Sequence, residues 1–431
     1  MIFDEEKIDG LIKQCRITEA IAAQASVGSE RRQRAGIFAL AGDDRGVARA
    51  IDPELFACRS AADVAAYYLA MGIEPTVQDR LTAAAVLAWS ADSEGVYAAL
   101  DAAHDRAVSE KQFHFAIATR ERLAAHALLF GEIARARAAI AEAIVSAEAR
   151  ELSGWRLRCI AAAARLALEA GDLDVSAQLL ARGRAVARSS DELALFAGVG
   201  AQLAVEREDR DALERWTSES IVESALRSEE PDVAIAATIA TVIGVETPSS
   251  NSTAARALRR ALALTESPAK VPELFSIAAR YGDLDEARFA VAALAALWAP
   301  NRAYLNAHRL IAQAHLSLRN GERGESVDSA GDAARAFSAM GSRRWTNEAM
   351  RLLVSQEPAE RRMRPRSSAA ALTEREEQVA HLIRRGARNR EVAIALQISE
   401  HTVERHVSSI LGRLGLRSRW QISDPGRASE S

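Results

Sequence analysis

Residues 372–415 read LTEREEQVAHLIRRGARNREVAIALQISEHTVERHVSSILGRLG, a stretch that holds the signatures of three successive helices. Thr373 is a favoured N-cap, and Glu376 three residues later completes a capping box, which predicts a helix that begins at about Glu374. Its apolar positions recur at helical spacing: Val379, Leu382 and Ile383. Gly386 follows two arginines and is a typical signal for the end of a helix.

Two further helices are predicted after that glycine. The next N-cap candidate is Asn389, which opens a short helix through Leu396. A tight turn at residues 398–399 follows, and its serine caps a third helix over about residues 399–414. One face of the third helix is apolar: Val403, Val407, Ile410 and Leu414. The opposite face mixes polar and small side chains: His401, Glu404, Arg405, Ser408 and Gly412.

The outer face of the third helix has the residue types of a recognition helix. In a helix-turn-helix the second helix of the pair enters the major groove, and its exposed side chains contact base edges. Arg405 can donate two hydrogen bonds to a guanine, and Glu404 can accept one from a cytosine amino group. Ser408 can pair with several bases.

Positions beside this face are suited to phosphates. Thr402, His406 and Arg413 border it and are better placed for the DNA backbone, where contacts set register rather than sequence. Arg388 and Arg390 precede the turn and add positive charge around it.

Residues 372–422 resemble the LuxR-type DNA-binding domain at nearly every motif position. The resemblance rests most on the runs 403–407 (VERHV), 411–415 (LGRLG) and 417–419 (RSR). It implies a four-helix domain with the third helix in the major groove and the fourth helix used for dimer contact. Carried over position by position, it implies base-facing residues at Glu404, Arg405 and Ser408, and backbone contacts at Thr402, His406 and Arg413.

The chain departs from the LuxR pattern at two places. Family members often carry Lys or Arg where this chain has Glu404, and often a basic residue where it has Ser408. The fourth helix, which can start near Ser418, is short because Pro425 and Gly426 follow soon after.

Two other interpretations of residues 372–422 are open. One is a small helical cap on a larger helical protein, against which three capped helices and a basic balance in one compact segment argue. The other is the fourth region of a bacterial sigma factor, which also ends in a helix-turn-helix. The upstream chain has no aromatic-rich segment of the kind that melts a promoter.

Charge is distributed unevenly along the chain. The 431 residues have a formal net charge of −4, but residues 361–431 hold 14 Arg and 8 acidic residues, which gives this end +6. A basic C-terminal end on an acidic body fits a DNA contact made by that end alone, since neutralising phosphates supplies most non-specific affinity. We therefore expect double-stranded DNA as a partner.

The preceding residues have the pattern of paired helices. Residues 1–355 are rich in Ala, Leu, Arg and Glu, and strand-like alternation is scarce. Turn signals recur every 34 to 40 residues, at Asp92, Gly131, Gly171, Glu208, Pro248, Gly282 and Gly321. Such a period is typical of a helical-hairpin repeat array, in which stacked neighbours bury each other's apolar faces. The units loosely resemble tetratricopeptide (TPR) repeats, without the consensus aromatic positions.

We expect this body to bind an effector and not to catalyse. No P-loop, no dinucleotide-binding glycine motif and no Ser-His-Asp or Cys-His grouping is readable, so we expect no enzyme and no cofactor. Large LuxR-type regulators commonly carry an ATPase module ahead of helical repeats, and this chain resembles the C-terminal half of one without that module. Stacked hairpins usually present a groove, so the expected effector is a small molecule or a partner protein.

The remaining distinctive side chains are predicted to pack in the core. No metal is expected, because His308 and His315 share a helix spacing but no readable carboxylate partner. Core positions are predicted for Trp89, Trp155, Trp216, Trp298 and Trp345, and for Cys15, Cys58 and Cys159. The N-terminus has no secretory pattern, and no apolar run reaches the ~20 residues of a membrane helix. We expect a cytoplasmic protein without a membrane partner.

The sequence thus predicts an all-α protein, a TPR-like helical-hairpin array followed by a four-helix LuxR-type domain. Its predicted parts are a body at 1–355, a basic linker at 356–370, the DNA-binding domain at 371–424 and a tail at 425–431. The predicted function is a sequence-specific DNA-binding transcriptional regulator that acts as a homodimer. The alternative is a protein-interaction scaffold whose C-terminal domain binds DNA weakly or is vestigial.

Overall fold

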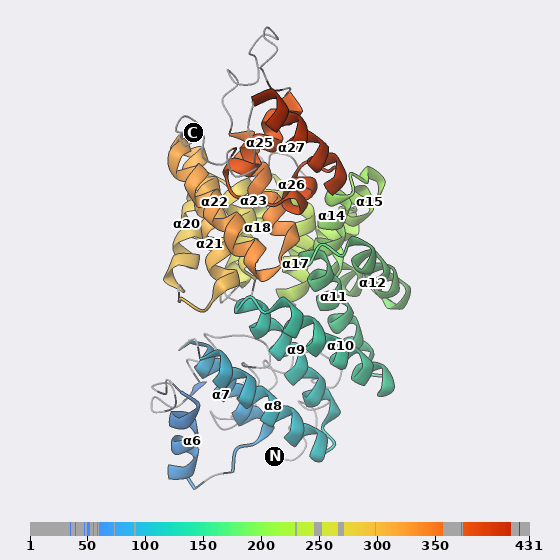
Figure 1. Ribbon diagram of the computed structural model, residues 1–431. Helices are drawn as coiled ribbons and strands as arrows, with labels where there is room; N and C mark the ends of the chain where they lie inside the picture. The colour runs from blue at the N-terminus through green and yellow to red at the C-terminus, as the bar shows by residue number, and fades with distance from the viewer. Residues whose placement is uncertain are drawn as a thin grey trace. The chain divides into compact units, whose positions relative to one another are not determined.

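The computed structural model describes residues 60–356, 372 and 374–414 with gaps at 73, 90–91, 229–230, 245–251, 266–270 and 298, together with Ile422 and isolated positions between 35 and 58. All regular elements within these ranges are α-helices, which confirms the predicted fold class (Figure 1). The chain divides into two compact units, Met1–Ala312 and Gln313–Ser431.

The first unit begins with a run of helices joined by tight turns. They are α6 (Ala61–Ala70), α7 (Val77–Trp89), α8 (Ser93–Ser109), α9 (Phe113–Leu129), α10 (Ile133–Ala149), α11 (Ser153–Glu169) and α12 (Leu173–Val186). From α7 to α12, each helix packs on the next in the chain. Fully buried alanines lie in these helices, and their small side chains let neighbouring helices approach closely: Ala103, Ala107, Ala118, Ala136, Ala143 and Ala147.

Glycine closes the turns where the sequence predicts them. Gly131 and Gly171 adopt left-handed backbone conformations, with φ of 86° and 77°. After α9, the N–H of Glu132 donates to the carbonyl of Ala127 at 2.8 Å, as in a Schellman helix ending. The carbonyls of the last turn are thereby satisfied before the chain reverses.

The predicted turn positions coincide with helix junctions wherever they are described. They precede helices at Asp92, Gly131, Gly171, Glu208, Gly282 and Gly321, whereas Pro248 lies outside the described residues. The spacing signal did not reveal the intervening turns, where Lys111 and Glu151 adopt φ of 60° and 56°. Helical hairpins of this kind fit a repeat array, and the specific likeness to TPR repeats stays a prediction.

The regular run of hairpins is interrupted by shorter helices in the middle of the chain. They are α13 (Ser190–Ala194), α14 (Ala197–Glu206), α15 (Arg210–Trp216), α16 (Glu219–Arg227), α17 (Pro231–Ile243) and α18 (Thr253–Leu264). α17, with the sequence PDVAIAATIATVI, is apolar on nearly every side and packs against α14, α16 and α18. A helix that is apolar all round is typically buried, and α17 is the centre of this region.

Capping fixes the last hairpin of the first unit. It contains α19 (Pro272–Tyr281) and α20 (Leu284–Ala296), and α21 (Ala303–Arg319) follows. The Asp283 N–H donates to Glu286 Oε2 and the Glu286 N–H donates to Asp283 Oδ1, each at 2.8 Å. This reciprocal pair is a capping box, so α20 begins directly after the turn at Gly282.

The second unit joins one helical hairpin to a C-terminal group of helices. It contains the end of α21, α22 (Arg323–Met340), α23 (Arg343–Ser355), α25 (Glu374–Arg384), α26 (Asn389–Ala395) and α27 (Glu400–Leu414). Ser326 on α22 donates to the Ala314 carbonyl of α21 at 2.7 Å. Phe337 and Trp345 stack between α22 and α23, with ring centroids 5.9 Å apart.

Several side chains predicted to pack are buried. Among the tryptophans and cysteines these are Trp155, Trp216, Trp345, Cys58 and Cys159; the side chains of Trp89, Trp298 and Cys15 are outside the described set. Buried His308 accepts or donates a hydrogen bond at 2.8 Å between its Nδ1 and Ser276 Oγ. His315 Nε2 lies 3.9 Å from Glu348 Oε1, a carboxylate neighbour that the sequence did not reveal.

No three His, Cys, Asp or Glu side chains among the described residues gather closely enough to hold a metal ion. None of the described helices has both the length and the apolar character that crossing a membrane requires.

Candidate nucleic-acid interface

Three short helices, α25, α26 and α27, build the candidate interface (Figure 1). Their apolar side chains form a common core. α27 packs against both of the others. The predicted inward faces are confirmed at Val379, Leu382, Ile383, Val392, Ala393, Val403, Val407 and Ile410, all of which are buried. The side chain of Leu414 is outside the described set.

α27 begins as the sequence predicts. The N–H of Thr402 donates to Ser399 Oγ at 3.0 Å, and the two hydroxyl oxygens lie 2.8 Å apart. This side-chain cap satisfies a donor in the first turn that has no partner within the helix. The cap fixes where α27 starts and therefore which of its residues face outward.

α25 also holds α27 in place. The buried carboxylate of Glu376 accepts a hydrogen bond from Ser409 on α27. Arg375 donates to the backbone carbonyl of Leu396, just after α26. These two bonds tie all three helices together through side chains. The predicted partner of Glu376 in a capping box, Thr373, lies outside the described residues.

The outer face of α27 is exposed. Glu404, Arg405 and Ser408 are exposed side chains, and Thr402 and His406 are partly buried beside them. Because Val403 and Val407 point into the core, the exposed residues project to the opposite side. Arg413 lies within α27, and its side chain is outside the described set.

Two exposed arginines lie at the start of α26. Arg388 immediately precedes the helix and Arg390 is in its first turn. Arg390 Nε lies 3.8 Å from Glu400 Oε1 at the start of α27. An exposed ion pair of this length contributes little to stability, so the Arg390 side chain can exchange this carboxylate for another anion at small cost.

These helices coincide with a known family. The family model described as "Bacterial regulatory proteins, luxR family" matches residues 370–424. This segment is a LuxR-family domain. It contains all of α25, α26 and α27, and it also includes Ile422, which is helical and buried. Apart from Ile422, the predicted fourth helix lies outside the described residues.

Other comparisons add no functional information. No curated protein matches the chain. Among solved structures, the chain is similar to a "Circular tandem repeat protein with novel repeat topology and enhanced subunit contact surfaces", with 15% identity over 96% of this chain and 86% of that chain. The TM-score of that likeness is 0.14, which is too low to support a structural argument.

The turn within the LuxR domain differs from the prediction of a turn at residues 398–399. The left-handed residue is Gln397, with φ of 52°, and the N–H of Ile398 donates to the carbonyl of Ala393 at 2.9 Å. Leu396, the buried C-cap of α26, is the last apolar contact of that helix with the core, so the chain must reverse immediately after it. The reversal therefore comes earlier than predicted.

The start of α26 also differs by one residue. Asn389 was the predicted N-cap, but it is the first helical residue and Arg388 is the N-cap. The carboxylate of Glu391 accepts from the Arg388 N–H at 2.7 Å. Because Glu391 satisfies this donor from inside the helix, the start does not need the asparagine side chain as a cap.

The LuxR domain contacts α22 within the second unit. Arg385 Nη2 donates to the carbonyl of Val327 at 3.0 Å, and Ser338 Oγ donates to Glu391 Oε1 at 2.8 Å. Burial lowers the pKa of the Arg385 guanidinium from its usual value, although Asp328 opposes this change. These contacts use α26 and the residue after α25, and the outer side chains of α27 stay exposed.

The sequence pattern predicts which residues lie on the outer face of α27. It does not predict the side-chain hydrogen bonds that hold α27 against α25. The sequence predicts a capping role for Glu376, whose partner Thr373 lies outside the described residues, but does not predict that its carboxylate accepts a hydrogen bond from Ser409. A signal for this was present, since Glu376 stands three and seven residues before Val379 and Ile383 and so shares their buried face. An acidic residue on a core-facing stripe indicates a polar partner in the core.

Proposed function

We propose that the protein is a sequence-specific transcriptional regulator that inserts α27 into the major groove of operator DNA. Glu404, Arg405 and Ser408 would contact base edges, because they are exposed together on one face of the second helix of a helix-turn-helix. The observation that carries the proposal is this exposed face on a capped helix within a LuxR-family domain.

The backbone contacts are assigned to residues beside that face. Thr402, His406 and Arg413 lie along α27, and Arg388 and Arg390 are at the start of α26. Their hydroxyl, imidazole and guanidinium groups are suited to phosphate oxygens. These contacts would fix the register of α27 on the duplex and give the salt dependence of binding.

We propose that the regulator is cytoplasmic and binds DNA as a homodimer, as the resemblance to LuxR proteins implies. The helical body would bind a small molecule or a partner protein as effector. The acidic balance of residues 1–360, with 41 basic and 51 acidic groups, supports a body that stays off DNA.

The base-reading role of Arg405 gives the first test. We predict that Arg405→Ala weakens binding of the full-length protein to its specific site by roughly 1–3 kcal/mol, because a bidentate contact to guanine is lost. Fluorescence anisotropy with a labelled operator measures this affinity, and thermal melting checks the fold.

The matched control is Arg384→Ala, which removes another exposed arginine, at the end of α25. It removes the same charge but no predicted base contact, so its effect on specific binding should be much smaller. Equal operator affinity for Arg405→Ala and the unsubstituted protein would eliminate α27 as the reading helix.

A protein-interaction scaffold with a weak or vestigial DNA-binding domain is the second candidate function. Glu404 favours it, because a carboxylate on the outer face opposes close approach to phosphates. The scaffold hypothesis requires that affinity for duplex DNA does not decline as salt is raised, since no phosphates are neutralised. A steep decline with salt supports the regulator instead.

A further inference from the structure

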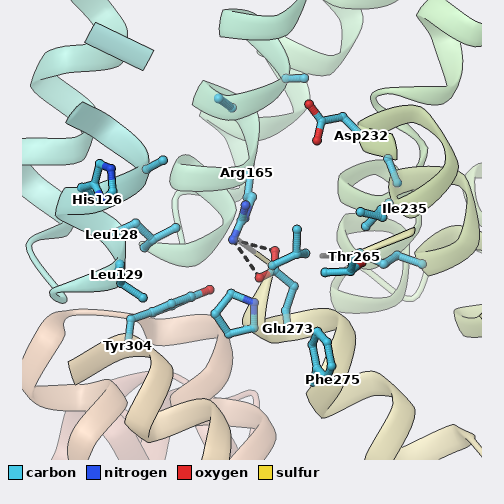
Figure 2. A pocket seen from close by; sticks show the side chains of 18 of the residues that line it. His126, Leu128, Leu129, Arg165, Asp232, Ile235, Thr265, Glu273, Phe275 and Tyr304 are labelled. Atoms are coloured by element: carbon cyan, nitrogen blue, oxygen red, sulfur yellow. Dashed lines mark hydrogen bonds and ion pairs between the residues drawn. The ribbon is translucent and has the colours of Figure 1, made fainter. Parts of the chain in front are cut away.

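A large cavity lies inside the first unit, away from any role assigned so far (Figure 2). Its volume is about 930 Å³. Small-molecule sites usually measure roughly 300–1,000 Å³, so the cavity has the size of such a site. Its walls come from helices far apart in the sequence, including α9, α11, α14, α17 and α19.

Most of the cavity wall is apolar. Leu128, Leu129, Ile235 and Phe275 line it, together with alanines from several helices. Phe289 on α20 also lines the cavity and is 53% exposed, with its ring centroid 6.3 Å from that of Phe275. A ligand with an apolar body would remove this exposed ring and the wall behind it from water.

Charged side chains in the wall interact with one another. Arg165 on α11 lies 2.7 Å from Glu273 on α19, and Figure 2 shows the two side chains pointing toward each other. The buried Glu169 carboxylate and Tyr304 also favour the charged form of Arg165. Because the pair with Glu273 connects two separate helices, we assign it the structural role of holding the walls together.

One buried amide in the wall has no partner among the residues that the structure describes. The side chain of Gln202 on α14 lines the cavity and is only 7% exposed. No described residue forms a hydrogen bond with its carboxamide. Buried polar groups are normally hydrogen-bonded, and a buried amide without a partner is destabilising. Water that enters the cavity, or a polar group of a ligand, would supply the missing hydrogen bonds.

The packing of α14 fixes where this amide lies. α14 packs against α17. A Cβ atom added at Gly198, one turn before Gln202, would lie 2.9 Å from the backbone carbonyl of Ala236 on α17. Since Gly198 and Ala236 line the cavity as well, this close approach fixes the place on the wall from which the Gln202 side chain extends.

A second polar group lines the cavity from α9. His126 is half-buried there, and no described residue forms a hydrogen bond with its imidazole. Burial and the charges of Arg122 and Arg302 lower the pKa of His126 to about 4, so the ring is neutral at pH 7. A neutral imidazole has one donor nitrogen and one acceptor nitrogen. Gln202 and His126 therefore each offer a ligand both a donor and an acceptor.

We propose that the cavity binds a small molecule with an apolar body and a carboxamide-like group, one that donates a hydrogen bond and accepts another. Gln202 pairs with this group through both atoms of its own amide, and the apolar body covers Phe289 and the leucines beside it. A ligand without the group leaves the buried amide unpaired, which makes Gln202 the residue that sets specificity. The ligand is the effector that the proposed function assigns to the helical body, and only its regulatory role rests on that function.

The test compares two neutral probes that share a naphthalene body and differ in one group. 2-Naphthamide carries the amide, and 2-methylnaphthalene carries a methyl group in its place. The full-length protein is titrated with each probe, and ligand-observed NMR gives both affinities. We expect saturable binding of 2-naphthamide, and its absence would overturn the cavity as a site for this class of ligand.

Gln202→Leu tests the assigned amide. The ratio of the affinity for 2-naphthamide to that for 2-methylnaphthalene should fall about tenfold, because hydrogen bonds to only one of the probes are lost. The matched control is Gln178→Leu on α12, where the side chain is exposed and does not line the cavity, and it should leave the ratio unchanged. An unchanged ratio in Gln202→Leu would overturn the role of Gln202.

The melting temperature of Gln202→Leu separates binding from a structural role. It should stay the same or rise by about 1–3 °C, since the variant removes a buried amide that no described residue satisfies. A lower melting temperature together with an unchanged affinity ratio would show that Gln202 serves the fold and not a ligand.

Further variants locate the binding. Ala162→Trp places an indole in the cavity and should weaken binding of both probes about tenfold or more, whereas Ala141→Trp at an exposed site of α10 should leave both unchanged. If Ala162→Trp fails to fold, Phe289→Ala alters an exposed side chain of the wall and should weaken both probes several-fold. Val145→Ala is its control at an exposed position outside the cavity. Unchanged affinities in Ala162→Trp and Phe289→Ala would overturn the location.

The outcomes separate this proposal from the proposed function. Arg405→Ala tests the DNA-binding role and should leave binding of both probes unchanged. A chain that fails to bind DNA but binds 2-naphthamide through Gln202 retains the cavity proposal and loses only the regulator. A chain that binds operator DNA through α27 but shows an unchanged ratio in Gln202→Leu keeps the regulator and loses the ligand assignment.

Discussion

At the scale of single residues, the backbone conformation of Gln397 sets the geometry of the helix-turn-helix. Its φ of 52° is left-handed. This conformation destabilises a residue other than glycine by about 1–2 kcal/mol. Glycine avoids that strain but loses more backbone entropy on folding, which offsets roughly 0.5–1 kcal/mol of the gain. We predict that Gln397→Gly stabilises the LuxR domain by roughly 0.5–1 kcal/mol, measured as slower amide hydrogen exchange in α26 and α27.

A glycine placed inside α26 is the control for Gln397→Gly. Ala393→Gly should instead accelerate exchange, because an interior glycine costs a helix about 1 kcal/mol and this alanine is also buried. Faster exchange in Gln397→Gly than in the unsubstituted protein would contradict a left-handed residue at this turn.

His126 links the cavity of the first unit to pH. Its folded-state pKa of about 4 lies below the ordinary histidine value. Between pH 6.5 and 4 the unfolded chain therefore binds a proton that the folded chain excludes, so stability falls as pH falls through this window. We predict a loss of about 2 kcal/mol from this residue at pH 5 relative to pH 7.

The His126→Gln variant isolates that contribution from the other histidines. Its melting temperature should decline less than that of the unsubstituted protein between pH 7 and pH 5, because glutamine takes up no proton. Identical pH dependence in the two proteins would show that His126 is not excluded from protonation.

At the scale of the helices, glycine inside α14 is explained by the neighbouring α15. A Cβ atom added at Gly200 would lie 2.2 Å from the indole ring of Trp216. We predict that Gly200→Ala lowers the free energy of unfolding by about 1–3 kcal/mol through overpacking, despite the higher helix propensity of alanine. Urea denaturation measures the change.

Gly324 in α22 provides the opposite case for the same substitution. A Cβ atom there meets nothing within 4 Å. Gly324→Ala should therefore be neutral or stabilise by up to about 1 kcal/mol. If Gly200→Ala also stabilised the protein, helix propensity and not the contact with Trp216 would decide the outcome at Gly200.

The elements show which features local sequence can predict. Ser399 and the glycines at the hairpin turns act on their own helix ends, so their roles were readable from spacing. Arg165 and Glu273 pair across 108 residues, and no local pattern connects them. The interrupted run from α13 to α18 was missed for the same reason, since its packing around α17 depends on contacts between distant segments.

At the scale of the whole molecule, the two proposed activities lie in different compact units. The cavity lies within Met1–Ala312, and the LuxR-family domain lies within Gln313–Ser431. The basic balance is confined to the C-terminal end, where residues 361–431 carry 14 Arg against 8 acidic residues. DNA affinity is therefore expected from this end alone, with the body supplying regulation.

The central claim is that α27 reads a specific DNA sequence, and genome-wide binding tests it most directly. Full-length protein is mixed with sheared genomic DNA, and the bound fragments are sequenced in parallel with those bound by Arg405→Ala. We predict an enriched motif with approximate two-fold symmetry, which is lost in the variant. The same motif enriched equally by both proteins, or no enriched motif with either, would contradict the account.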